Sequence, residues 1–280
     1  MTTSSESAHR SYPEPLASFL TLGEPALRPD QWLDYSALGI TAEHISQLIA
    51  MATDEQLNTR TPSHDAAVWA PVHAWRALGQ LRALEAAGPL SRLFDILEDD
   101  DWVSSDLRHA FALIGPAALP VLAEYIGRSA HGAFPRAVAA EAMVEVARAH
   151  PDTRDGCVAT VAAQLEPFAS QDPTLNGLLV AALMDLQAVE AAPVMERAFA
   201  AGSVDLTVSG DWEDVQMELG LLAERLTPRP RLWNSGFASM MESPHGALPT
   251  QAVVRNRENT KHRRQMAKAS RRRNRKRKKK

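Results

Sequence analysis

The sequence predicts an all-α protein, and three observations favour that class. Between Val72 and Leu226 the apolar residues recur at positions i, i+3, i+4 and i+7, which is the period of an amphipathic helix. Proline residues stand where successive helices are expected to begin. No segment with the alternating pattern of a strand interrupts the series. The expected architecture is a right-handed α-solenoid of helical hairpins with a disordered basic C-terminal tail.

The first 63 residues are expected to lead into this array. Residues 1–28 are predicted to form an extended N-terminal segment, and residues 29–63 a helical N-terminal cap. The cap is less regular than the centre, and its apolar side chains, such as Trp32, Tyr35 and Leu48, are available to cover the first repeat. Thr53 and Gln56 have the spacing of a capping box, so a short helix is predicted to start there.

The repeat array is predicted over residues 64–228. Its helices are expected at apolar groups of which Leu90–Leu97, Leu107–Ile114 and Leu175–Leu186 are examples. A proline fits the first helical turn because its missing amide hydrogen has no partner there. The prolines that fit this role are Pro89, Pro116, Pro151, Pro173 and Pro193. Because the links are short, successive helices are expected to lie antiparallel.

Two internal echoes support a repeat. Residues 84–90 (LEAAGPL) are echoed by residues 189–194 (VEAAPV), and residues 77–79 (ALG) by residues 113–115 (LIG). The second pair is separated by 36 residues, which lies within the range of a two-helix repeat. One hairpin cannot cover its own apolar stripe, so neighbouring hairpins are expected to stack.

Charge is distributed very unevenly along the chain. Residues 255–280 hold fifteen Lys or Arg and one acid, Glu258, while the preceding 254 residues hold fifteen Arg, no Lys and 33 acids. Residues 229–254 are rich in Ser, Gly and Pro and are predicted to be a flexible linker. The sequence thus predicts a basic disordered tail at 255–280 on an acidic body.

The tail is the strongest candidate for a binding segment. It has no aromatic residue to stack on a base and no apolar face, which favours sequence-independent contact with phosphates. RNA, including ribosomal RNA, and DNA are both expected partners, and anionic lipid stays open as an alternative. The candidate nucleic-acid-binding residues are Lys261, Arg263, Arg264, Lys268, Arg271, Arg272, Arg273, Arg275, Lys276, Arg277, Lys278, Lys279 and Lys280.

The helical pattern resembles a known repeat class. Residues 69–81 (WAPVHAWRALGQL) and 210–220 (GDWEDVQMELG) are similar to segments of HEAT repeats of the phycobilisome-lyase-like type, in a bacterial family of uncharacterised proteins. The resemblance covers about residues 12 to 227. It implies a HEAT-like fold and carries over no functional residues, because the repeat motif specifies a fold and not an activity.

No pattern of catalytic or metal-binding residues is recognised. Di-iron hydroxylases of HEAT-like architecture use His-Glu pairs, and none of the nine His residues is followed by Glu. Cys157 is the only cysteine, which excludes an intramolecular disulfide and a Cys-rich zinc site. No cofactor, no metal and no enzymatic activity are predicted. The absence of a secretion signal and of an apolar stretch of about 18 residues predicts a cytoplasmic protein without a membrane span.

Two Asp-Trp dipeptides are candidate sites for a protein partner. Asp99, Asp100, Asp101 and Trp102 form one group, and Asp211 and Trp212 form the other. Each group precedes an expected helix, so solvated turns and half-buried packing residues are the simpler interpretation. The alternative is that they lie on the rim of a concave face that holds a peptide.

These observations lead to one functional hypothesis and two alternatives. The chain is interpreted as a non-enzymatic adaptor that binds a protein through the repeats and nucleic acid through the tail, with RNA or the ribosome favoured over specific DNA. In the first alternative, the tail masks the acidic body until a protein partner displaces it. In the second, which depends only on the resemblance, the chain is a phycobilin-lyase-like enzyme. The partner's identity and the oligomeric state are left open.

Overall fold

The computed structural model describes residues 11–62, 64–98 and 102–229, and within these ranges every regular element is a helix. The predicted all-α class is therefore confirmed for this part of the chain. The α-helices are α1 (Ile45–Ala52), α2 (Ala70–Gln80), α3 (Ala87–Ser91), α4 (Leu93–Ile96), α5 (Arg108–Ile114), α6 (Leu119–Gly127), α7 (Ala133–Ala149), α8 (Arg154–Leu165), α9 (Pro173–Asp185), α10 (Ala192–Ala200), α11 (Leu206–Ser209) and α12 (Trp212–Glu218).

Short helical turns join these helices. The 3-10 turns are η1 (Leu16–Leu20), η2 (Pro29–Gln31), η3 (Ser36–Leu38), η4 (Ala42–His44), η6 (Ala66–Trp69), η7 (Leu84–Ala86), η9 (Pro116–Ala118), η10 (Pro151–Thr153), η11 (Phe168–Ser170) and η12 (Val189–Ala191). Two π-helical turns are η5 (Gln56–Arg60) and η8 (Val103–Leu107). Within the described ranges no single helix is long and apolar enough to cross a membrane; residues 105–114 and 116–127 pass that test only as a pair bent by 109°.

The chain divides into two compact units, which comprise residues 1–160 and residues 161–280. The repeat array that the sequence predicts over residues 64–228 stays a prediction, and it spans both units. The boundary falls inside α8, so the apolar period runs across it without a break. Helical periodicity reports which side of a helix is buried and not which helices share a compact unit, which is why the division is not visible in the sequence.

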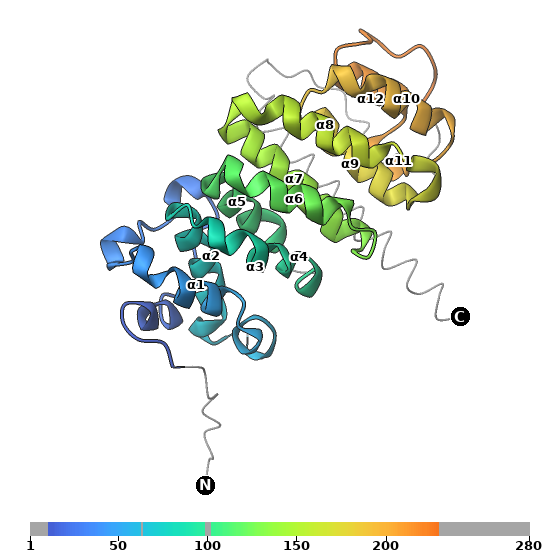
Figure 1. Ribbon diagram of the computed structural model, residues 1–280. Helices are drawn as coiled ribbons and strands as arrows, with labels where there is room; N and C mark the ends of the chain where they lie inside the picture. The colour runs from blue at the N-terminus through green and yellow to red at the C-terminus, as the bar shows by residue number, and fades with distance from the viewer. Residues whose placement is uncertain (1–10, 63, 99–101, 230–280) are drawn as a thin grey trace, which may run out of the picture. The chain divides into compact units, whose positions relative to one another are not determined.

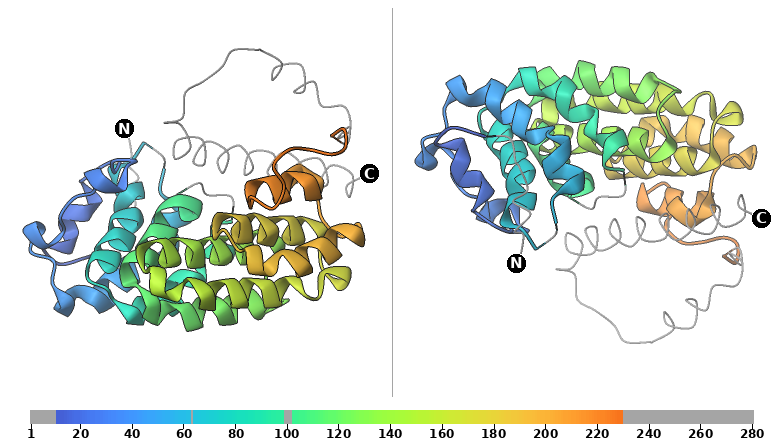
Figure 2. Two further views of the ribbon diagram at one scale, coloured as in Figure 1. Left: turned by 90° about the horizontal axis from the view of Figure 1, so that it is seen from above. Right: turned by 90° about the horizontal axis from the view of Figure 1, so that it is seen from below.

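In the first unit α2, α5 and α7 are successive neighbours. Helix α2 packs against α1 and α5, and α5 packs against α7, while α6 packs against both α3 and α7 (Figure 1). The same helices can be followed by colour, from teal to light green, in the two views of Figure 2. Aromatic rings join the helices inside this unit: the Phe94 ring centroid lies 5.6 Å from that of Phe111 and 5.4 Å from that of Tyr125.

One glycine allows α2 to approach α5 closely. A Cβ atom placed on Gly79 would lie 3.1 Å from the Cα of Ala110 and 3.2 Å from its carbonyl oxygen. Such contacts are tighter than most Cβ atoms make, and they could be relieved only by a small shift of the backbone, because backbone atoms cannot turn aside as a flexible side chain can. Gly79 ends the first of the two ALG/LIG segments, and its partner Gly115 ends α5 with a φ of 93°. Both glycines thus lie near the end of a helix, but Gly79 allows a close helix contact and Gly115 adopts a backbone conformation with positive φ.

The longer sequence echo adopts one repeated structure. After α2 the chain turns at Arg82, with a φ of 52°, and after α9 it turns at Gln187, with a φ of 53°. At both turns the backbone amide of a residue just after the helix donates to the carbonyl oxygen of the residue five positions earlier. The amide of Ala83 donates to Leu78, and that of Ala188 donates to Leu183, each at 3.0 Å. A 3-10 turn and then an α-helix follow in each case, η7 with α3 and η12 with α10. The echo therefore marks two equivalent helical hairpins.

These turns yield a prediction about stability. Arg82 is exposed and holds a left-handed backbone conformation that disfavours residues with a Cβ. Arg82→Gly should therefore raise the free energy of unfolding by about 0.5–1 kcal/mol, measured by chemical denaturation. The matched control is Arg92→Gly, because Arg92 is also exposed but has right-handed helical angles. That change should lower stability by about 0.5–1 kcal/mol. Equal effects of the two changes would contradict the explanation.

In the second unit α9 packs against α11, and α10 packs against α12. A Cβ atom on Gly177 of α9 would lie 3.0 Å from the carbonyl oxygen of Asp205, so the contact of α9 with the start of α11 also favours a glycine. Asn176 is fully buried, and its amide nitrogen donates to the carbonyl oxygens of Phe168 at 2.9 Å and Ser203 at 2.6 Å. These bonds tie the segments on both sides of α9–α10 to one helix.

The predicted proline positions agree with the helix starts in most cases. Pro116, Pro151 and Pro173 are the first residues of η9, η10 and α9, and Pro193 is the second residue of α10. Pro89 is the third residue of α3, still within its first turn. The fixed φ of proline and its missing amide hydrogen explain this placement.

The N-terminal segment differs from the prediction of an extended chain over residues 1–28. Among its described residues, Leu16–Leu20 form the turn η1, which packs against η6 and α2, and both Leu16 and Phe19 are fully buried. Leu16 and Phe19 are three residues apart, so one helical turn brings both side chains to the same face. Residues 29–62 contain η2 to η5 and α1, which agrees with the helical character expected for 29–63.

The predicted capping box at Thr53 and Gln56 is wrong. Helix α1 ends at Ala52, and the Thr53 hydroxyl donates back to the carbonyl oxygen of Ile49. Asp54 caps the following turn instead, because its Oδ1 accepts from the amides of Gln56 at 2.9 Å and Leu57 at 3.2 Å. A carboxylate is an equally good cap, and it stands one residue closer to the turn.

Candidate functional site

Most of the predicted binding residues lie outside the described part of the chain. These are the tail cations from Lys261 to Lys280 and the acids Asp99, Asp100 and Asp101; of the predicted linker, only residue 229 is described. Their roles stay predictions. Trp102, Asp211 and Trp212 are described, and the structure gives each of them a definite set of contacts.

Trp102 lies half-buried immediately before η8. Its ring packs edge-to-face against that of Trp69, with 5.1 Å between the ring centroids. Its carbonyl oxygen accepts from the amide of Asp106 at 2.7 Å. Trp102 therefore joins the start of η8 to the end of η6, as expected for a large aromatic residue that precedes a helix.

Asp211 and Trp212 start α12. The Oδ1 atom of Asp211 accepts from the amide of Asp214 at 3.0 Å, and Oδ2 of Asp214 accepts from the amide of Asp211 at 3.3 Å. This reciprocal pair is a capping box, so Asp211 satisfies helix amides that have no other partner. The Trp212 ring packs on that of Phe199, 5.7 Å away in α10. At the second Asp-Trp dipeptide, Asp211 therefore caps α12 and Trp212 packs against α10.

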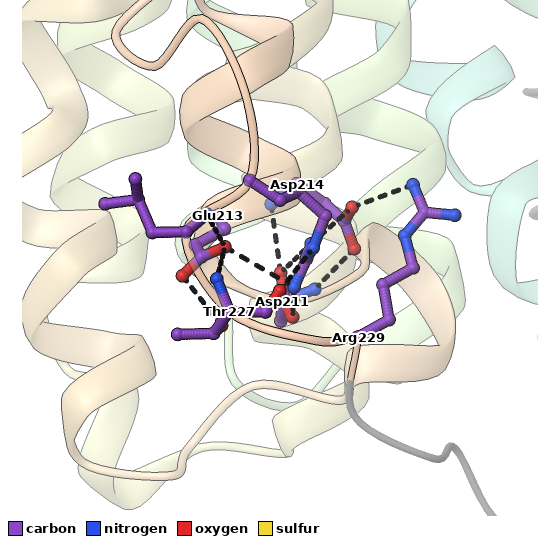
Figure 3. Close-up of polar contacts among 7 residues, drawn as sticks. Asp211, Glu213, Asp214, Thr227 and Arg229 are labelled. Atoms are coloured by element: carbon purple, nitrogen blue, oxygen red, sulfur yellow. Dashed lines mark hydrogen bonds and ion pairs between the residues drawn. The ribbon is translucent and has the colours of Figure 1, made fainter.

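Arg225 connects the chain after α12 to the acids that begin the helix. Its Nη2 and Nη1 atoms lie 2.6 and 2.9 Å from the two carboxylate oxygens of Asp211, and Nη1 lies 2.8 Å from Oδ1 of Asp214. Paired hydrogen bonds of this kind are the strong form of an arginine–carboxylate contact. Figure 3 shows these carboxylates converging at the start of α12. Sequence reasoning found Asp211 but missed its partner fourteen residues later.

The same acids hold the next residues of the chain. Glu213 accepts from the Thr227 hydroxyl at 2.7 Å and from the Thr227 amide at 3.1 Å, and Arg229 lies 3.1 Å from Asp214 (Figure 3). The hydrogen bond from Arg225 is the main cause that lowers the pKa of Asp211, and the hydrogen bond from the Thr227 hydroxyl is the main cause that lowers the pKa of Glu213. We name Asp211, Glu213, Asp214 and Arg225 the α12 clasp. It fixes residues 225–229 against the helix.

A second polar arrangement lies in the first unit, along one side of α2. His73, Arg76 and Gln80 are spaced i, i+3 and i+7, and all three bond to the backbone of residues 23–35. His73 Nε2 bonds to the carbonyl oxygen of Gly23 at 2.9 Å, and Arg76 Nη2 donates to that of Ala26 at 2.7 Å. Gln80 donates to the carbonyl oxygen of Leu33 at 2.7 Å. This polar stripe anchors residues 23–35 to α2.

Arg76 is the centre of this stripe and forms a buried ion pair. Its side chain is 1% exposed and that of Asp106 is 5% exposed, and Arg76 Nε donates to Oδ1 of Asp106 at 2.6 Å. The guanidinium carbon lies 4.3 Å from the centroid of the Trp32 ring and 5.8 Å from that of Trp102. Burial raises the pKa of Asp106, and the charge and hydrogen bonds of Arg76 oppose that rise.

Tyr35 and His73 form a neighbouring buried pair. The Tyr35 hydroxyl lies 2.7 Å from His73 Nδ1. Because the Gly23 carbonyl oxygen can only accept, His73 Nε2 donates to it, and Nδ1 is left to accept from the Tyr35 hydroxyl. This arrangement uses a neutral imidazole. Burial is the main cause that lowers the pKa of His73, and burial also raises the pKa of Tyr35.

The sequence contained a weak signal for these residues. Arg76 and His73 are polar residues within a segment that is otherwise apolar from Ala70 to Gly79, and a buried polar residue needs a partner. The partners are 30 to 50 residues away along the chain, at Asp106 and at residues 23–35. Local spacing cannot identify contacts over that separation.

Comparisons with known proteins identify no relative: no family model, no curated protein and no solved structure matches the chain. Among the described residues, no three His, Cys, Asp or Glu side chains are grouped so that they could hold a metal ion. The functional argument therefore depends on the chain's own charges, contacts and surfaces.

Proposed function

We propose that the protein is a non-enzymatic adaptor built as an α-solenoid of HEAT-like hairpins, which binds a protein partner through its folded body and nucleic acid through residues 255–280. The observation that carries the proposal is the separation of charge: fifteen cations and one acid in the last 26 residues, against 33 acids in the rest of the chain. RNA or the ribosome is the favoured target over a specific DNA sequence, because contact with phosphates does not select a base sequence.

The repeated hairpin supports the solenoid part of this proposal. The segments α2–α3 and α9–α10 share the same left-handed turn, the same hydrogen bonds and the same succession of helical turns. Repeated hairpins that each leave an apolar side uncovered are the units from which solenoids are built. Solenoids commonly present extended surfaces to other proteins, which is the reason for assigning partner binding to the body.

The acidic character of the second unit supports assigning nucleic-acid binding to the tail and not to the body. Its described residues, 161–229, hold eleven acids and three arginines. Those arginines are already paired: Arg197 with Glu166, and Arg225 and Arg229 with the acids of α12. A surface of this charge repels phosphates, so the described part of the second unit offers no free arginine to bind them, in contrast to the fifteen cations of residues 255–280.

Deletion of residues 255–280 tests the proposal. The full chain should bind a mixed-sequence RNA with an affinity that falls steeply with salt. If about eight cations contact duplex phosphates, the slope of log affinity against log salt should be about −7, and somewhat shallower for single strands. The deleted chain should lose this binding while its helical melting transition stays unchanged. Fluorescence anisotropy and circular dichroism measure the two quantities.

A chain with the same tail residues in shuffled order is the matched control for this deletion. It should bind as well as the natural chain, because phosphate contact of this kind does not depend on sequence. RNA binding that survives removal of residues 255–280, or that is lost on shuffling, would overturn the proposed role of the tail.

The α12 clasp favours a second candidate function, in which the tail masks the acidic body. Arg225 and Arg229 show that acids of the second unit already bind arginines of the chain's C-terminal part. A linker of about 24 residues would keep tail and body at high effective concentration. Crosslinks from tail lysines to body acids that disappear at high salt would support masking. A tail with the same mobility at low and high salt would exclude it.

A further inference from the structure

A surface recess of about 370 Å³ lies in the first unit, where residues 32–40 cross the end of α2. Its walls combine two aromatic residues, three aliphatic residues and three polar residues: Trp32 and Tyr35, Ile40, Ala77 and Leu81, and Asp34, Ser36 and Gln80. The volume is within the range of small-ligand sites, and the wall combines apolar side chains with polar groups that can orient a ligand.

Asp34 supplies a negative charge to this recess. Its Oδ1 accepts from the Ser36 hydroxyl at 2.6 Å and from the Ser36 amide at 2.9 Å, and the hydroxyl bond is the main cause that lowers the pKa of Asp34. The carboxylate is therefore ionised at neutral pH. No cationic side chain within the described ranges forms an ion pair with it, although Asp30, four residues earlier, pairs with Arg28.

The carboxylate is held in a rigid frame. The Gln80 amide accepts from the amide of Tyr35 at 3.1 Å and donates to the carbonyl oxygen of Leu33 at 2.7 Å, so it fixes the backbone on both sides of Asp34. Tyr35 itself is 1% exposed and bonded to His73. A binding group that is fixed before the ligand arrives loses little entropy on binding.

Trp32 supplies an aromatic surface beside this charge. The indole is half-buried and lines the recess, and the Arg76 guanidinium already lies 4.3 Å from its ring centroid. Arg76 therefore occupies one face of the ring, and a guanidinium from a ligand would stack on the other face. Tryptophan is the aromatic side chain that attracts cations most strongly.

We propose that this recess binds an arginine side chain of a protein partner, with the guanidinium between the Asp34 carboxylate and the Trp32 ring and the aliphatic stem against Ile40 and Leu81. Arginine fits better than lysine because its planar group can stack on an aromatic ring while its N–H groups donate to a carboxylate. The inference depends on the proposed adaptor function, since it names the chemistry by which the body recognises its protein partner. Residues 11–160 hold more acids than arginines, and this negative charge is complementary to the positive charge of an arginine on the partner.

The test uses the full chain with its six tryptophans labelled with ¹⁵N at the indole nitrogen. The probe is N-acetyl-arginine-amide, and its neutral isostere is N-acetyl-citrulline-amide. The Trp32 signal is identified by its loss in Trp32→Phe. We expect the arginine probe to shift this signal with a dissociation constant in the millimolar range, which is usual for one side chain in a small site. The citrulline probe should bind at least fivefold more weakly.

Asp34→Asn should weaken binding of the arginine probe at least fivefold. The asparagine keeps an oxygen that can accept from Ser36, so the turn is retained while the charge is lost. Asp30→Asn is the matched control, since it removes the same charge four residues away and should leave the dissociation constant within twofold. Equal affinity of the natural chain and Asp34→Asn, or equal affinity for arginine and citrulline, would overturn the site. Neither outcome bears on the tail, whose RNA binding is measured separately.

Discussion

Replacement of Asp106 by asparagine should lower the free energy of unfolding of the first unit by about 3–5 kcal/mol. The reason is the burial of Arg76, which is 1% exposed and has Asp106 as its counter-ion. Without the carboxylate a cation stays in a site with little water, and the remaining bonds to the Ala26 carbonyl oxygen and the ring of Trp32 do not neutralise it. Chemical denaturation of the full chain, followed by circular dichroism, gives the measurement.

The double change Arg76→Met and Asp106→Leu separates the energy of the pair from the cost of breaking it. Two apolar residues of similar volume should recover most of the loss, because the desolvation of both charges is removed together. The Ala26 carbonyl oxygen loses its donor, so a deficit of about 1–2 kcal/mol should remain. The exposed pair Arg60–Glu55 is the control, and Arg60→Ala should change stability by less than about 0.5 kcal/mol. A cost below about 1 kcal/mol for Asp106→Asn would contradict a buried, charged pair.

Stability should also fall as the pH is lowered from about 6.5, and His73 should cause part of this fall. Its pKa in the folded chain is lowered by burial, so the unfolded chain binds more protons between the folded pKa and the ordinary value of about 6.5. The stabilisation is present above about pH 6.5 and is lost as the pH falls towards the folded pKa. The slope that His73 contributes should approach about 1.4 kcal/mol per pH unit in that window.

His73→Gln should remove this contribution. Protonation would place a hydrogen on Nδ1, where the Tyr35 hydroxyl now donates, and a positive charge near Arg76, which also lowers the pKa of His73. Glutamine does not titrate, so the variant should show a flatter dependence of unfolding free energy on pH between 5 and 7 even if its stability at pH 7 is lower. His64→Gln is the control, because His64 is exposed, and it should keep the slope of the natural chain. Parallel pH curves for the natural chain and His73→Gln would be incompatible with a neutral, buried His73.

The parts of the fold that could be predicted from the sequence are those set by local physics. A 3.6-residue apolar period predicts helices, proline marks their first turns, and the LEAAGPL echo marks equivalent hairpins. Each of these signals acts within a few residues. The all-α class and the helix starts at Pro116, Pro151 and Pro173 agree with the structure for that reason.

The parts that could not be predicted depend on contacts between distant residues. Leu16 and Phe19 are buried against α2, which no local pattern in the N-terminal segment indicates. The bond between Arg76 and Asp106 spans 30 residues, and that between Tyr35 and His73 spans 38. Asp211 was visible as an acid before a helix, but its bond to Arg225 was not. The sequence gives the type of each of these residues, but it does not give the distant residue that each one contacts.

The α12 clasp also has a mechanical consequence for anything attached to the end of this protein. Residues 225–229 are tied to the first turn of α12, so a pulling force applied beyond residue 229 would load the contacts of Arg229 and Thr227 first and then the bonds of Arg225 to Asp211 and Asp214. A large cargo held by the C-terminus would thus be tethered at one fixed point of the second unit. Low pH would loosen that tether, because protonation of Asp211, whose pKa the hydrogen bond from Arg225 lowers, removes the charge that holds the arginine.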